Sequence, residues 1–335
     1  MAKELPEPRT LQEAVLYFAS AERCQQFLTE ARWPDGEVKC PWCGSGAVRY
    51  MSKYRRWYCG GAHERKQFSI KVGSIFEDSP LPLQKWLPAV WMLVNCKNGI
   101  SSYELHRAIK VTQKTAWFML QRIRLAMQTG TFEKVAGHVE IDETFIGGKA
   151  RNMHKDVRAR KIKGTGGAGK VAVMGLLQRH GKKGHSTVKT IVLSTRRKAE
   201  LGATVRRNVE AESTIYTDEL PSYNDLAPDY VHNVINHAEE YARGAVHTNG
   251  IENFWSLLKR AIRGTYVSVE PFHLFRYLDE QAFRFNERKD EDGDQGRFRT
   301  VACQLWGKRL TYKELIGEGE TEPSSPAPAF SPVPA

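Results

Sequence analysis

The sequence predicts an α/β protein in which two small modules precede a larger domain, and three observations support this fold class. From His138 onward, apolar β-type segments alternate with helical ones, as expected of a sheet flanked by helices. Residues 83–127 have apolar spacing typical of helices. A short, turn-rich stretch between residues 34 and 75 gathers side chains that bind metals.

The composition indicates a globular chain with a polyanionic partner. Apolar residues make up 41% and charged residues 26%, and no apolar run approaches the ~20 residues that span a bilayer. The N-terminal MAKELPEPRT does not resemble a secretory signal, so we expect a cytoplasmic location and no membrane partner. The net charge of +12 favours nucleic acid as the partner. The alternative is a basic charge that only keeps the chain soluble.

Changes in composition and periodicity divide the chain into segments. Residues 10–32 have helical spacing, and a Pro/Ser-rich acidic tail at the other end predicts disorder. We expect an N-terminal helical segment (1–33), a zinc ribbon (34–75), a helix-turn-helix-like region (80–130), the main α/β domain (136–290), a C-terminal extension (291–315) and the tail (316–335).

The cysteine cluster predicts one structural zinc ion. Cys40-Pro-Trp-Cys43-Gly forms the first half of the cluster, and Cys59 with His63 forms the second. Tetrahedral zinc takes four nitrogen or sulfur ligands, which this set supplies. A redox pair fits less well because no βαβ pattern surrounds Cys40 and Cys43. The fourth ligand is His63 or, with a harder oxygen, Glu64, and we prefer His63.

Two short helices are predicted between residues 99 and 128. Ser101 and Glu104 have capping-box spacing, and Thr112 can begin the second helix. Such a pair suits insertion into the DNA major groove, although a plain helical connector is the alternative. Apart from its apolar stripe, the second helix carries side chains that we predict to contact DNA: Gln113, Trp117 and Gln121.

Acidic pairs stand within or at the end of two β-type segments. Asp142-Glu143 lies within HVEIDETFIGG, and Asp218-Glu219 ends STIYTDE. A buried carboxylate is costly unless it meets a partner or a metal, and Mg²⁺ prefers oxygen ligands. Successive strand residues point to opposite faces, so one member of each pair should face the metal. Periodicity does not decide which member does so.

A third acid lies on a predicted helix from Asn249 to Arg263. Glu252, Lys259 and Arg263 fall within roughly 40° of one another around this helix, beside its apolar stripe. A carboxylate followed by cations on one line can bind a metal and hold a phosphate. An ordinary solvated helix face with paired charges is the alternative. The two acidic pairs upstream favour the metal site.

A basic segment from Lys149 to Lys170 separates the first two acids. It holds eight lysines and arginines and a single acid, Asp156. Its glycine-rich end nearly matches a nucleotide-binding P-loop, but Val171 replaces the required Ser or Thr and a strand follows. We therefore expect a flexible loop that contacts the DNA backbone, with a merely solvated loop as the alternative.

These stretches together resemble the insertion-sequence fifteen-ninety-five family of DDE transposases, which are bacterial mobile-element enzymes with an N-terminal zinc ribbon. The resemblance runs from about Arg32 to Arg288. In that family the second zinc pair is usually two cysteines, whereas here His63 follows Cys59. The matching stretches are CPWCG, QFSIKVGSIFEDSPLPLQKW, HVEIDETFIGG, YTDEL, HTNGIENFWSLLKRAIRGTY and RYLDEQAFRFNER.

The resemblance implies a ribonuclease-H-like mixed sheet with flanking helices that carries a catalytic metal triad of Asp142, Asp218 and Glu252. It implies two Mg²⁺ (or Mn²⁺) ions, phosphoryl transfer on DNA, and substrate contacts from Lys259 and Arg263. Asp142 would contact both ions, and Asp218 and Glu252 one each.

The implied partners are the terminal inverted repeats of an insertion sequence and its target DNA, which would place the chain at the nucleoid. Bringing two DNA ends together implies at least a homodimer. Two other functions stay open at this stage. One is a ribonuclease-H-like nuclease that cuts without joining, and the other is a non-catalytic zinc-ribbon DNA-binding regulator.

Overall fold

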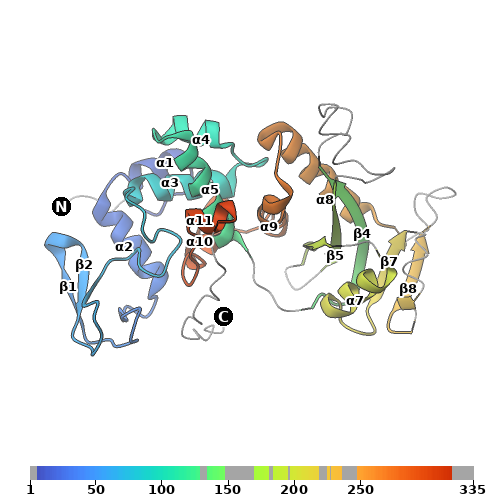
Figure 1. Ribbon diagram of the computed structural model, residues 1–335, viewed down its shortest axis with the longest axis horizontal. Coiled ribbons are helices and arrows are strands. Elements are labelled where there is room, and N and C mark those ends of the chain that lie inside the picture. Colours follow the sequence, from blue (N-terminus) through green and yellow to red (C-terminus); the bar gives the residue numbers. More distant parts are fainter. Residues whose placement is uncertain are drawn as a thin grey trace. The chain divides into compact units, whose positions relative to one another are not determined.

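The computed structural model describes residues 6–128, 134–147, 170–180, 184–194, 197–218, 225–226, 228–235 and 247–318. The predictions for the basic segment at 149–169, for Glu219 and for the tail beyond residue 318 lie outside these residues. The chain divides into two compact units. The first comprises residues 1–96, 101–127 and 291–335, and the second comprises 97–100 and 128–290 (Figure 1).

Helices build most of the first unit around the buried helix α3 (Leu83–Asn95). The expected helical segment at 10–32 divides into α1 (Leu11–Tyr17) and α2 (Ala21–Arg32), because the Ser20 hydroxyl caps a new helix. Aromatic rings join distant segments: the Trp91 and Phe298 centroids lie 5.0 Å apart. Phe298 belongs to α10 (Asp294–Cys303), and the unit ends with α11 (Tyr312–Ile316).

The predicted pair of short helices is present as α4 (Ser102–Ile109) and α5 (Gln113–Met127). Ser101 and Glu104 form the expected capping box, and Lys110 ends α4 at a left-handed φ of 53°. The Thr112 hydroxyl then accepts the N–H of Thr115 at 3.2 Å. As predicted, the apolar stripe of α5 is buried: Ala116, Met119, Leu120, Ile123 and Met127.

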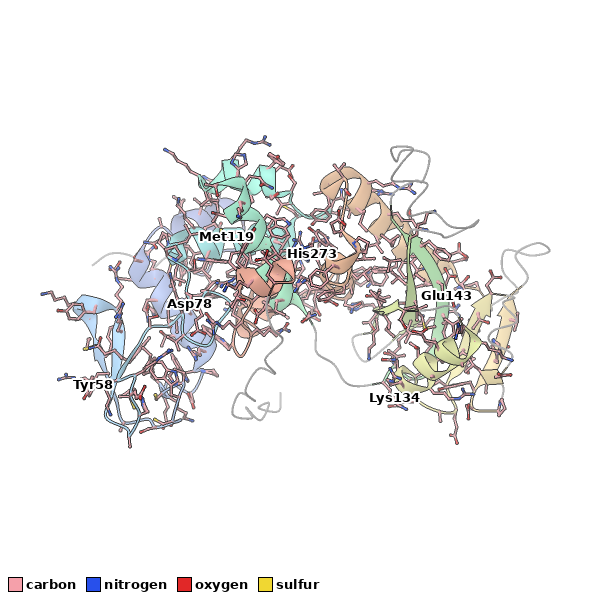
Figure 2. The ribbon with its side chains drawn as sticks, in the orientation of Figure 1. Tyr58, Asp78, Met119, Lys134, Glu143 and His273 are labelled. Carbon is pink, nitrogen blue, oxygen red and sulfur yellow. The ribbon has the colours of Figure 1, made fainter. Side chains whose placement is uncertain are left out.

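A small antiparallel sheet forms the ribbon of the first unit, in the order β1 (Val48–Met51), β2 (Arg56–Cys59) and β3 (Gln67–Phe68). The 3₁₀ turn η1 (Ser52–Tyr54) joins β1 to β2. The inner face of this sheet is aromatic. The Trp57 ring stacks on Phe68 with centroids 5.5 Å apart and lies edge-on to Trp33 at 5.7 Å. Tyr58 points to the other face and is 38% exposed (Figure 2).

The second unit contains a mixed five-stranded sheet with the strand order β6-β5-β4-β7-β8. Strands β6, β5 and β4 pair antiparallel, whereas β4, β7 and β8 pair parallel. The predicted mixed α/β architecture is therefore confirmed for this unit. The strand bounds are β4 (His138–Ile146), β5 (Val171–Gln178), β6 (Thr187–Leu193), β7 (Thr214–Asp218) and β8 (Val231–Ile235).

Helices cover both faces of this sheet. On one face, α7 (Lys198–Asn208) packs its Leu201 and Val205 against Val139 and Ile141 of β4. On the other face lie α8 (Asn249–Ala261), its π-helical continuation η4 (Ile262–Tyr266), and α9 (Leu274–Asn286) after the short turn η5 (Pro271–His273). None of the helices in the described part of the chain is long and apolar enough to cross a bilayer.

Candidate metal centres

The first candidate centre is the cysteine–histidine cluster of the ribbon. Cys40 Sγ lies 3.4 Å from His63 Nε2, and Cys43 Sγ lies 3.6 Å from Cys59 Sγ. A tetrahedral zinc ion with bonds of about 2.0–2.3 Å separates its ligand atoms by roughly 3.5 Å, so the set fits zinc. Glu64 is exposed and does not join the cluster. The geometry therefore supports a structural zinc with His63 as the fourth ligand.

Backbone geometry allows this cluster to close. Gly44 has a φ of 69°, the left-handed conformation that turns the chain after Cys43. A Cβ on Gly61 would lie 3.0 Å from Cys43 Sγ and 3.3 Å from Cys59 Sγ. The Gly61 N–H instead donates to Cys59 Sγ at 3.3 Å.

The second candidate centre is an open pocket of about 520 Å³ between β4 and α8. It brings together two of the predicted acids, Asp142 and Glu252, with the predicted DNA contacts Lys259 and Arg263. Acidic and basic side chains in one open pocket suit a metal-bound phosphate chain. The lining residues are Asp142, Glu143, Thr144, Glu252, Trp255, Ser256, Lys259, Arg260 and Arg263.

The alternation of side chains along β4 determines whether Asp142 or Glu143 faces α8. Ile141 packs on the α7 side of the sheet, so Asp142 lies on the α8 side and Glu143 alternates back (Figure 2 labels Glu143 on β4). The Trp255 indole N–H donates to Asp142 Oδ2 at 2.9 Å. Helix α8 therefore orients the Asp142 carboxylate and also carries Glu252.

Asp218 lies on the same side of the sheet at the end of β7. Glu140 of β4 pairs with Tyr216 of β7, and Asp142 and Asp218 each stand two residues further along these parallel strands. Burial raises the pKa of Asp142 above its ordinary value of 3.8, and the charges of Glu252 and Asp218 raise it further. The negative charges of Glu252 and Asp218 therefore reach Asp142 and disfavour its charged form.

The three acids are nevertheless spaced more widely than ligands of a single ion. Among the described residues, the cysteine–histidine set is the one group of three or more His, Cys, Asp or Glu whose ligand atoms all lie within 4.8 Å of one another. Two ions about 4 Å apart, each bound at about 2 Å, would accommodate outer ligands up to roughly 8 Å apart. A two-ion site therefore allows the wider spacing, whereas a single ion bound by all three acids does not.

The predicted DNA contacts of α5 differ in their exposure. Gln113 is half-buried and donates to the Ser102 hydroxyl at 2.8 Å, and Trp117 is half-buried. Gln121 is fully buried, which removes it from the surface on which the sequence placed it. All residues from 119 to 124 are buried, so α5 is packed on every side at this level and leaves no surface there for position 121.

Glu140 is a buried acid near the pocket that the sequence patterns did not single out. Glu140 is 1% exposed and lies on the α8 side of β4, two residues before Asp142. Its carboxylate pairs with Arg179 at 2.7 Å and accepts the backbone N–H of Ile251 at 2.8 Å. The alternation in Val-Glu-Ile-Asp could have indicated this residue, because it puts Glu140 on the same strand face as Asp142.

Two family models match the parts of the chain in which the candidate centres lie. The family model of the ISXO2-like transposase domain matches residues 134–286, and that of the transposase zinc-ribbon domain matches residues 19–61. The zinc-ribbon match ends before His63, so the assignment of the fourth ligand depends on the geometry of the cluster.

Two curated proteins are similar to this chain. An uncharacterized protein in transposable element ISH50 of Halobacterium salinarum is 29% identical over 255 residues, or 72% of this chain and 83% of that protein. An uncharacterized transposase-like protein of Haemophilus influenzae is 34% identical over 100 residues, or 30% of this chain and 80% of that protein.

Proposed function

The chain belongs to the ISXO2-like family of insertion-element transposases, and on this premise we propose that it cleaves and joins DNA strands at the pocket between β4 and α8. One observation carries the proposal: Asp142 and Glu252 share a single open pocket with the cations Lys259, Arg260 and Arg263. Such a pocket has acceptors for divalent metal ions and donors for the phosphates of a DNA strand.

Asp142, Asp218 and Glu252 would hold two Mg²⁺ or Mn²⁺ ions. Asp142 is the central ligand because it lies next to Glu252 in the pocket and feels the charges of both other acids. When bound, the ions would supply activation of the attacking oxygen and stabilisation of the leaving oxygen in a phosphoryl transfer. The Trp255 N–H donates to Oδ2 of Asp142 and so orients the carboxylate in the pocket.

The architecture that we propose for the second unit is ribonuclease-H-like. Its support is the strand order, in which an antiparallel β6-β5-β4 set is extended by the parallel strands β7 and β8. Because β4 and β7 run parallel and pair through Glu140 and Tyr216, Asp142 within β4 and Asp218 at the end of β7 stand at matching positions. In the first unit, α4 and α5 would act as a helix-turn-helix.

DNA is the proposed partner, in the form of terminal inverted repeats and target DNA. Lys259 and Arg263 would contact the strand beside the metal site, and Gln113 and Trp117 would contact DNA at α5. The net charge of +12 supports attraction to DNA. A dimer or larger assembly would hold two DNA ends together, and the chain would act at the nucleoid.

A strand-transfer assay tests the proposal. The full chain is incubated with Mg²⁺ and a duplex that carries the DNA flanking its own gene, together with a labelled target. We expect nicked donor and joined product, and no product from Asp142→Asn. Cleavage without joining would favour a nuclease, and binding without cleavage would favour a regulator. Either result would contradict the proposal.

A further inference from the structure

We propose that Glu140 is a positioning residue for the metal site, which it serves by fixing the first turn of α8 and thereby Glu252. This inference rests on the proposed function, because Glu252 must be a metal ligand for its position to matter. Glu140 stands on the same face of β4 as Asp142 and is almost fully buried. It does not line the pocket that holds Asp142 and Glu252, and its contact with the Ile251 N–H links it to α8.

The first link is a helix cap supplied by the sheet. The first N–H groups of a helix have no partner within the helix, and a negative charge there is favourable. Glu140 Oε2 accepts the N–H of Ile251 at 2.8 Å. Thr248, the residue before α8, makes no side-chain capping hydrogen bond. Glu140 of β4 therefore supplies the acceptor for the first turn of the helix.

The second link holds the segment that leads into the helix. Arg179 Nε donates to Glu140 Oε1 at 2.7 Å, and its guanidinium lies 4.2 Å from the centre of the Tyr216 ring. The same guanidinium donates to the backbone carbonyl of His247 and lies 2.9 Å from His247 Nδ1. Glu140 and Arg179 thus fix the two sides of one turn, His247 and Ile251.

The third link reaches the proposed ligand. Thr248 follows His247, and its hydroxyl donates to Glu252 Oε1 at 3.0 Å. Glu252 is the residue after Ile251, so the backbone that Glu140 holds is the backbone that aims the Glu252 side chain. A shift of this turn would move Glu252 relative to Asp142, which is fixed on β4.

Gly250 shows how closely the carboxylate and the helix fit. A Cβ at this position would lie 2.9 Å and 3.1 Å from the two oxygens of Glu140, and 3.1 Å from Leu177 Cδ2. Gly250 has an ordinary helical backbone, so its conformation does not require glycine. The close approach of the Glu140 carboxylate requires it instead. Residues outside the ligand shell that orient ligands typically change metal affinity by about 10–100-fold when replaced.

The experiment compares Glu140→Gln and Gly250→Ala with the parent chain. Manganese affinity is measured by titration of the full chain, and the Mg²⁺ concentration for half-maximal cleavage is measured on the same DNA. We expect both quantities to weaken by about 10-fold or more, with cleavage restored by excess Mg²⁺. DNA affinity and zinc content should stay unchanged, which a loss of folding would not allow.

Glu280→Gln is the matched control. Glu280 is also a fully buried acid of the same unit, paired with Arg284 one turn along α9. Its replacement removes the same charge and should lower the melting temperature without changing the metal dependence. If Glu140→Gln folds poorly, Gly250→Ala decides the question, because alanine is the better helix former.

The outcomes separate this inference from the function on which it rests. Wild-type metal dependence in Glu140→Gln and Gly250→Ala, with cleavage lost in Asp142→Asn and Glu252→Gln, would overturn the positioning role alone. A fall in the maximal cleavage rate of Glu140→Gln and Gly250→Ala that excess Mg²⁺ does not restore would also overturn the positioning role. Parent-like cleavage by Asp142→Asn and Glu252→Gln would overturn the proposed function.

Discussion

Trp255 donates its indole N–H to Oδ2 of Asp142 across 2.9 Å, and this bond ties helix α8 to the middle of strand β4. Gly175, opposite Asp142 on β5, makes the contact possible, because a Cβ there would lie 2.6 Å from the Trp255 ring. Trp255 is 4% exposed, so the donor side of the bond is buried, while Asp142 also lines the open pocket. The same helix face therefore orients one proposed ligand and carries another.

Replacing Trp255 with Phe should make metal binding more sensitive to acid. The indole bond lowers the pKa of Asp142, in opposition to burial, which raises it above 3.8. Without the bond the pKa rises further, so protons displace the metal at a higher pH. We expect the Mg²⁺ concentration for half-maximal cleavage to rise by about 10-fold, most steeply below neutral pH. An unchanged profile between pH 5 and 8 would show that the bond does not tune Asp142.

Asp142→Asn should stabilise the metal-free chain while it abolishes cleavage. The raised pKa of Asp142 means that its charged form is disfavoured in the folded state, so its contribution to stability falls as the pH rises from 3.8 through the raised pKa. At pH 7 the neutral amide avoids this cost.

Thermal unfolding tests this expectation. The buffer contains a chelator that removes Mg²⁺ and Mn²⁺ but binds zinc more weakly than the ribbon does. The variant should melt about 2–4 °C above the parent at pH 7, and the difference should shrink near pH 4. In excess Mn²⁺ the order should reverse, because metal binding stabilises only the parent. A variant that melts lower at pH 7 would show that Asp142 serves the fold.

Much of this arrangement was predictable because its signals are local. The capping box at Ser101 and Glu104 depends on neighbouring residues, and the structure contains it. The apolar stripe of α8 follows from helical period alone, and it buries Ile251, Phe254, Trp255 and Leu258. The pairing of Cys59 with His63 in one zinc cluster likewise follows from residue type and spacing.

What was not predictable depends on contacts between distant segments. Period cannot choose between Asp142 and Glu143, since the choice depends on which face α8 covers. Gln121 is polar yet fully buried, because tertiary packing around α5 overrides its chemical type. The role of Glu140 needs both the register of β4 and the entry point of α8, which are separated by 111 positions in the chain.

His63→Ala should lower zinc content, whereas Glu64→Ala should leave it unchanged. His63 Nε2 lies 3.4 Å from both Cys40 and Cys59, and Glu64 is outside the cluster. Loss of one of four ligands should weaken zinc binding at least about 100-fold and unfold the ribbon. Elemental analysis of the purified chains gives the answer, and His63→Cys should restore the metal. Zinc loss in Glu64→Ala instead would reassign the fourth ligand.

Lys259→Ala should weaken DNA binding and reduce its dependence on salt. Lys259 lines the acidic pocket, where a strand phosphate would meet it. Each lost phosphate contact should reduce the slope of log affinity against log salt by about 0.9. Lys198→Ala is the control, because that exposed lysine of the same unit pairs with Asp225 at 2.6 Å and lies on α7. Equal changes in the two variants would mean that only net charge matters.

Anomalous scattering from crystals grown with Mn²⁺ tests the central claim most directly, because it locates the ions without reference to activity. We expect two Mn²⁺ ions about 4 Å apart, with Asp142 on both and with Asp218 and Glu252 on one each. Manganese peaks that lie away from Asp142, or an Asp218 carboxylate that no ion reaches, would contradict the account.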